Sequence, residues 1–106
     1  MIIMNIIDFE DFVSFAIEED LMSPITVNGS MMMEVRHELL LSGIVCDFSP
    51  GAIDTFAYHY PQNVRVSHFE IEIRPNKDFT HKLWQTRPMN EELETKIPTI
   101  WKKLKK

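Results

Sequence analysis

The sequence predicts an α+β fold with a small antiparallel, three- to four-stranded meander over residues 43–74, two helices before it and one or two helices after it. Three observations favour this class. Between Gly43 and Arg74, runs of β-branched and aromatic residues alternate with turns that contain Pro, Gly and Asn. On both sides of that stretch, apolar residues recur at helical spacing. The length of 106 residues fits a single domain over residues 1–106.

The predicted meander consists of three strands, Gly43–Phe48, Ile53–Tyr60 and Val64–Arg74, with turns at residues 49–52 and 61–63. Side chains alternate across a strand, so the second strand would place its aromatic residues Phe56, Tyr58 and Tyr60 on one face. The third strand changes parity between its valines and its later apolar residues. A slip of one residue is typical of a β-bulge, which we place at Ser67-His68.

The first part of the chain predicts a strand and then a helix. Ile2–Ile7 is apolar except for Asn5, and forms either a short edge strand or a packed arm. Asp8 then offers an N-cap, and apolar residues at helical spacing predict an amphipathic helix over Asp8–Met22. This helix ends before Ser23-Pro24, because the residue before proline avoids the helical region.

Residues 25–33 allow two interpretations. Asn28-Gly29 between apolar runs favours a hairpin turn, whereas the alternative is a loop before a helix that Ser30 caps. Good helix formers dominate the following residues, so we predict a helix over Met31–Ser42. Gly43 lies where a C′ glycine ends such a helix.

Beyond the meander, the sequence predicts a short helix over Lys77–Gln85, which Arg87-Pro88 interrupts. Asn90 then caps a final helix with acids near its start and lysines at its end, as the helix dipole favours. Pro98 lies inside this helix, so we expect either a kink or two half-helices.

Charge is distributed unevenly along the chain. The net charge is −5, but residues 1–60 hold ten acids and Arg36 as their one base, a charge of −9. Residues 61–106 carry +4, from ten bases and six acids. Such asymmetry indicates the kind of partner rather than the fold. The acids that we expect to contact a basic protein are Asp11, Glu18, Glu19, Asp20, Glu34 and Glu38.

No catalytic or cofactor signature stands out, so we expect neither a cofactor nor a metal. Cys46 is the only cysteine and lies among apolar residues, which favours a core position over a nucleophile. The four histidines form no zinc-binding spacing, and the three glycines form no phosphate-binding loop. No apolar run is long enough to cross a bilayer, and the first seven residues are too short for a signal peptide, so we expect a cytoplasmic protein.

One enzyme class has a similar order of elements. A helix, three strands and a helix form the core of PD-(D/E)xK nucleases, where acids on two adjacent strands hold a divalent metal against the phosphate. The resemblance implies metal-binding roles for Asp54 and for Glu72 in Glu72-Ile73-Arg74, with Glu38 on the preceding helix. Arg74 stands where this family has lysine, and no proline precedes Asp54.

Three hypotheses about function follow. The first is a small acidic protein-binding domain that inhibits a basic nucleic-acid-processing protein, as immunity proteins and phage anti-defence proteins do. The second is the metal-dependent nuclease. The third is a structural subunit that self-associates through a strand edge or an exposed sheet face. Because the first half is acidic, we do not expect direct binding to nucleic acid.

Overall fold

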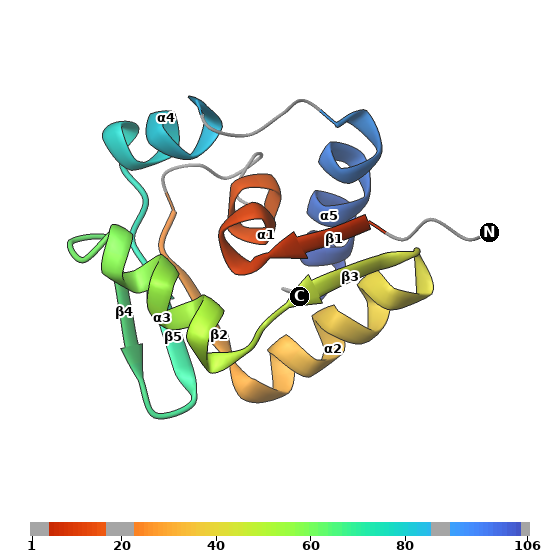
Figure 1. Cartoon of the computed structure of the whole chain (residues 1–106), viewed down its shortest axis with the longest axis horizontal. Coiled ribbons are helices and arrows are strands. Elements are labelled where there is room, and N and C mark those ends of the chain that lie inside the picture. Colours follow the sequence, from red (N-terminus) through yellow and green to blue (C-terminus); the bar gives the residue numbers. More distant parts are fainter. Residues whose placement is uncertain (1–4, 17–22, 86–89, 105–106) are drawn as a thin grey trace.

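A computed structural model describes residues 5–16, 23–85 and 90–104 of the chain (Figure 1). Within these residues the fold is α+β, with five strands and five helices. In chain order the elements are β1 (Asn5–Asp8), α1 (Phe9–Ala16), β2 (Ile25–Asn28), α2 (Gly29–Leu41), β3 (Ile44–Asp47), α3 (Pro50–His59), β4 (Val64–Ser67), β5 (Glu70–Ile73), α4 (Lys77–Gln85) and α5 (Glu91–Leu104).

The described strands form two separate small sheets. β1 pairs with β3 in parallel, so that Ile6 lies beside Val45 and Asp8 beside Asp47. The other sheet is antiparallel and three-stranded, in the order β2-β5-β4. In Figure 1 the β1–β3 pair crosses the middle of the molecule, whereas β2, β4 and β5 stand together at the left of the view.

One hydrophobic core lies between the two sheets and the helices, and aromatic rings fill much of it. Phe12 of α1 meets the Trp101 ring of α5 at 5.6 Å between centroids and the Phe48 ring at 5.2 Å. Phe56 of α3 is 1% exposed and its ring lies 5.4 Å from that of Phe9. Edge-to-face contacts of this kind add to the area that the rings bury.

Side-chain caps explain where the first two helices begin. The carboxylate of Asp8 accepts a hydrogen bond from the Asp11 N–H at 2.8 Å, and the Asp11 carboxylate accepts one from the Asp8 N–H at 3.0 Å. This reciprocal pair satisfies donors that the first turn leaves without helical partners. At α2, the Asn28 side chain accepts from the Met31 N–H at 2.8 Å. The start of the predicted helix over Asp8–Met22 is thus confirmed, and its last six residues lie outside the described part.

The region of residues 25–33 combines features of both interpretations. Ile25–Asn28 is a strand, but its partner is β5 and not a neighbouring hairpin arm. Asn28 rather than Ser30 caps α2, so the helix begins two residues before the predicted Met31. Gly43, with φ +80°, follows the end of α2 as expected for a C′ glycine.

The predicted middle strand of the meander, Ile53–Tyr60, is wrong, because residues 53–59 lie in α3 and Tyr60 is its C-cap. Ser49 caps the helix, accepting from the Ala52 N–H at 3.2 Å, and Pro50 takes its first position. A proline there is favourable, since it lacks only an N–H that a first turn leaves unpaired. The helix buries Phe56 and leaves Tyr58 82% exposed, so these two side chains do not share a face.

The predicted third strand, Val64–Arg74, is also wrong in detail, because it folds back as a hairpin. β4 pairs with β5 in antiparallel register across a two-residue turn at His68-Phe69. His68 has φ +49°, the sign that two-residue hairpin turns demand of a central residue. The parity change that suggested a bulge at Ser67-His68 therefore marks a turn.

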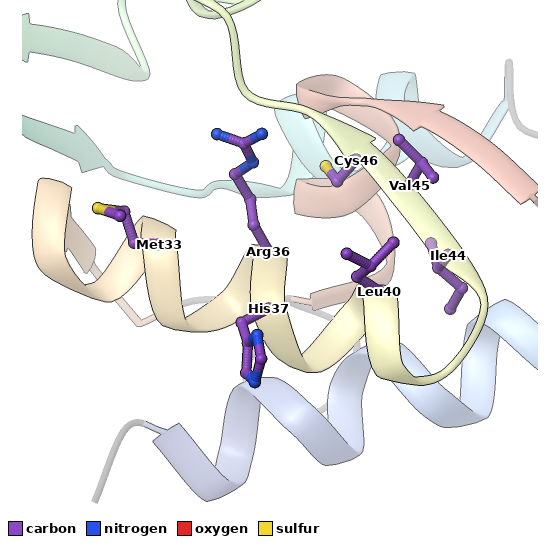
Figure 2. A pocket seen from close by; sticks show the side chains of 7 residues that line it. All are labelled: Met33, Arg36, His37, Leu40, Ile44, Val45 and Cys46. Atoms are coloured by element: carbon purple, nitrogen blue, oxygen red, sulfur yellow. The ribbon is translucent and has the colours of Figure 1, made fainter.

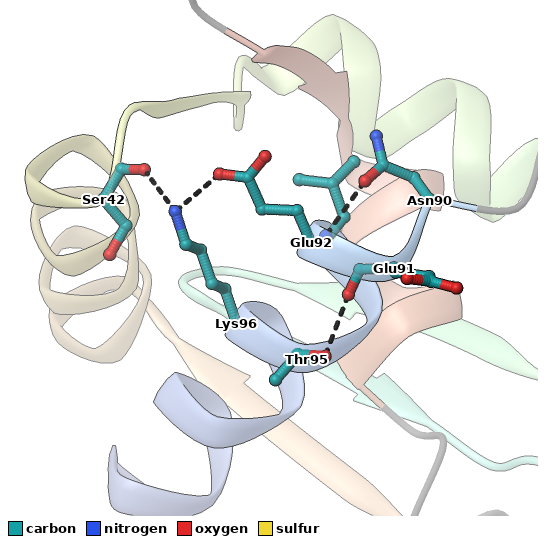
Figure 3. A network of polar contacts seen from close by, with 7 residues as sticks. Ser42, Asn90, Glu91, Glu92, Thr95 and Lys96 are labelled. Carbon is teal, nitrogen blue, oxygen red and sulfur yellow. Dashed lines mark hydrogen bonds and ion pairs between the residues drawn. The ribbon is translucent and has the colours of Figure 1, made fainter.

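The two predicted C-terminal helices are present as α4 and α5. Asn90 caps α5 by accepting from the Leu93 N–H at 3.2 Å, and the helix runs through the buried Pro98 rather than dividing there. Lys96 joins α5 to the end of α2, since its Nζ donates to the Ser42 carbonyl at 3.2 Å and to the Glu92 carboxylate at 2.6 Å (Figure 3). Residues 86–89, with the predicted break at Arg87-Pro88, lie outside the described part.

Candidate functional site

The parallel β1–β3 pair presents one face to the core and one face outward. Ile7, Ile44 and Cys46 share the inner face and are buried. The register places four side chains on the other face, which we call the outer face: Ile6, Asp8, Val45 and Asp47. Ile6 is 76% exposed, Val45 is half-buried, and both aspartates are exposed. The outer face is therefore apolar where the strands begin and acidic where they end.

A groove adjoins the outer face at Val45. It lies between α2 and β3, has a volume of about 270 Å³, and is lined by Met33, Arg36, His37, Leu40, Ile44, Val45 and Cys46. Figure 2 shows the Met33, Arg36 and Leu40 side chains standing along α2, with β3 running past them. Met33 is 71% exposed and Leu40 53% exposed, so apolar side chains border the groove as well as the strands.

The charged form of Asp47, at the acidic end of the outer face, is stabilised. Asp47 accepts a hydrogen bond from the Ser49 N–H at 3.0 Å, and the N–H and hydroxyl of Ser49 lower the pKa of this carboxyl, with a smaller contribution from the Arg36 guanidinium. Asp8, the neighbour of Asp47 in the register, takes part in the cap of α1. Both carboxylates thus combine a structural hydrogen bond with exposure to solvent.

Cys46 lies close to these carboxylates on the buried side of β3, and its thiol is not activated as a nucleophile. Burial raises the pKa of its thiol, and the nearby carboxylates of Asp8, Asp11 and Asp47 raise it further. A thiol that stays protonated at neutral pH is a poor nucleophile. The predicted core position is confirmed.

The structure describes three of the six acids that the sequence analysis selected. Asp11 lies in the first turn of α1, close to the acidic end of the outer face. Glu34 is exposed on α2, while Glu38 on the same helix faces Lys103 of α5 at 4.0 Å. Glu18, Glu19 and Asp20 lie outside the described residues.

The residues of the nuclease resemblance occupy different elements. Asp54 is exposed on α3, not on a strand, and Glu72 of β5 forms an ion pair with Arg74. Glu38 of α2 is paired with Lys103 of α5. Among residues 5–16, 23–85 and 90–104, no group of three or more His, Cys, Asp and Glu side chains is placed to hold a metal ion.

Sequence reasoning did not predict that Ile6, Val45, Asp8 and Asp47 form one surface. The missing information was that β1 and β3 are parallel neighbours, which pairs residues that are 39 positions apart. One signal was present: Val45 and Asp47 alternate with buried residues of β3, as Ile6 and Asp8 do in β1.

No protein-family model matches the chain, and neither curated proteins nor solved structures show a match to it. Within the described residues, no helix combines the length and apolar character that crossing a membrane requires.

Proposed function

We propose that this chain is a small acidic protein-binding domain whose contact surface is the outer face together with the groove between α2 and β3. The observation that carries the proposal is the exposure of Ile6, at 76%, beside the half-buried Val45 on a parallel sheet. Parallel sheets are normally covered on both faces, so a face of such a sheet that is left in water favours a partner that covers it.

The charge of the surface supports a basic partner. Asp8 and Asp47 lie at one end of it, Asp11 lies close by, and Arg36 in the groove is the one base among the first 60 residues, which together carry −9. Complementary charge speeds the encounter of two proteins and selects among partners. Proteins that handle nucleic acid carry basic surfaces that neutralise phosphates, so the specific form of the proposal is an inhibitor that blocks such a protein, of the immunity or phage anti-defence type.

Affinity capture from host extract, with elution across a salt gradient, tests the proposal. The immobilised full chain is compared with Ile6→Glu and with the double variant Asp8→Asn/Asp47→Asn. Asparagine keeps the acceptor oxygen that each aspartate uses in its cap or turn, so it removes charge without removing the hydrogen bond. A partner retained by the parent chain, released by salt, and lost by both variants supports the proposal. A captured protein that both variants retain equally contradicts it.

Self-association is the second candidate, and the same exposed sheet face favours it, because two copies could cover each other's apolar residues. The assay that separates the two is the mass of the purified chain by light scattering across a concentration series. A dimer that Ile6→Glu dissociates would favour this candidate. For the nuclease hypothesis, the described residues offer no supporting arrangement.

A further inference from the structure

The outer face of the β1–β3 pair lacks the covering layer that parallel sheets usually have on both faces. The inner face of β1 and β3 packs into the core through Ile7, Ile44 and Cys46. On the outside, Ile6 remains exposed. Parallel sheets normally have both faces covered by helices, because the crossover connections between parallel strands are helical. The geometry therefore favours a helix rather than a loop as the missing layer.

The pattern of side chains on the outer face restricts what such a helix must present. Ile6 and Val45 lie side by side, and Asp8 and Asp47 lie side by side two residues further along the strands. Two residues of a strand span about 7 Å. A helix advances about 6 Å per four residues, so a helix aligned with the strands meets the apolar pair and the acidic pair one turn apart.

We propose that the outer face and the groove bind a basic amphipathic helix of the partner protein, with apolar side chains at positions i and i+4 and Lys or Arg at i+7 and i+8. This inference rests on the proposed function and specifies the element that the partner supplies. The apolar positions cover Ile6, Val45 and the exposed Leu40 of α2, and the basic positions meet Asp8 and Asp47. Charge complementarity is what favours this occupant over a second copy, because Lys or Arg side chains of a partner helix pair with Asp8 and Asp47, whereas the same face of a second copy carries no base.

The probe for this inference is a pair of alanine-based helical peptides of identical composition. The first carries leucines at i and i+4 and lysines at i+7 and i+8. The second has the same leucines, but its lysines stand at i+5 and i+6, about 160° away around the helix. Binding of each labelled peptide to the full chain is measured by fluorescence anisotropy at several salt concentrations, against matched variants of the chain.

The matched variants compare residues on the outer face with residues elsewhere. Ile6→Glu is compared with Tyr58→Glu, because Tyr58 is 82% exposed on α3. Asp8→Asn/Asp47→Asn is compared with Asp54→Asn, which also lies exposed on α3. We expect the first peptide to bind at least tenfold more tightly than the second. Ile6→Glu should weaken binding of the first peptide at least tenfold. Asp8→Asn/Asp47→Asn should weaken this binding severalfold and reduce its dependence on salt, while both α3 variants should leave it unchanged.

Three results would overturn the inference. Equal binding of the two peptides would show that the positions of the lysines on the helix do not matter. Unchanged peptide binding by Ile6→Glu would show that the peptide does not bind at the outer face. A dimer of the chain that Ile6→Glu dissociates would make a second copy the occupant. If extract capture depends on Ile6 while neither peptide binds, the proposed function stands and the helical partner element is rejected. If neither capture nor peptide binding depends on Ile6, both fail.

Discussion

Replacing Phe56 by Ala tests the helix α3 directly, because the helical and extended arrangements of residues 53–60 predict different partners for Phe56 and Tyr58. In the structure Phe56 is 1% exposed and its ring lies 5.4 Å from Phe9 and Tyr60 and 6.2 Å from Phe79, between centroids. Tyr58 is 82% exposed. In an extended strand the two side chains would share one face.

The magnitudes separate the two arrangements clearly. Truncation of a buried Phe to Ala lowers the free energy of unfolding by about 3–5 kcal/mol, whereas an exposed position such as Tyr58 changes it by no more than about 0.5 kcal/mol. For a domain of this size, about 3 kcal/mol corresponds to a fall in Tm of at least roughly 12 °C. The loss expected for Phe56→Ala is a large fraction of the free energy of unfolding of a typical domain. Phe56→Leu therefore serves as the milder variant, with an expected loss of about 1–2 kcal/mol.

The assay is urea unfolding followed by circular dichroism, with Tyr58→Ala as the matched control in the same segment. The helical arrangement predicts a large loss for Phe56→Ala, a smaller loss for Phe56→Leu and almost none for Tyr58→Ala. Comparable losses for Phe56→Ala and Tyr58→Ala would refute the reasoning, because they would mean that the two side chains are buried on the same face.

Three further predictions concern backbone, cap and thiol. Gly43→Ala should lower the free energy of unfolding by about 1–2 kcal/mol, because φ is +80° there. Gly51→Ala inside α3 should raise the free energy of unfolding by about 0.5–1 kcal/mol. Urea unfolding of both variants checks this prediction, and changes of the same sign in the two variants would contradict it. Asn28→Ala should cost about 1 kcal/mol by removing the cap of α2, and an unchanged unfolding midpoint would show that the cap is not formed. Cys46 should resist alkylation at pH 8 until the chain unfolds, because burial raises the pKa of its thiol. Since the unfolded thiol ionises first, the contribution of Cys46 to stability should be present below about pH 9 and be lost as the pH rises further; rapid labelling of the native chain would contradict the burial.

Local signals predicted the helices well where caps and periodicity agreed. Asp8 and Asn90 act as the predicted caps, and Gly43 takes the left-handed conformation expected after α2. These interactions join residues within a few positions of each other, so the sequence itself contains both partners. Helix ends of this kind depend little on the rest of the fold.

The segment of α3 shows why a local signal can mislead. Phe56, Tyr58 and Tyr60 alternate like a strand and are rich in aromatic residues, but Ser49-Pro50 is also a cap followed by a first-turn proline. Tertiary packing decides between the two, since only the helix buries Phe56 among the core rings while Tyr58 points to solvent. Intrinsic preference is overridden by burial in such cases.

The hairpin and the candidate surface were missed for different reasons. The turn at His68-Phe69 contains no glycine or asparagine, so the usual sequence signature of a tight hairpin is absent. The outer face depends on the parallel pairing of Ile6 with Val45, which are far apart along the chain. Long-range pairings of this kind cannot be inferred from composition or periodicity, whereas the acidity of the first half could be.

The most direct test of the proposed surface is a nuclear magnetic resonance titration of the isotope-labelled full chain with the captured partner. The account predicts that amide shift changes concentrate at Ile6, Val45, Asp47 and the exposed side of α2 near Leu40. Changes concentrated instead around Tyr58 on α3, with the outer face unaffected, would contradict the proposal that this face binds a basic protein.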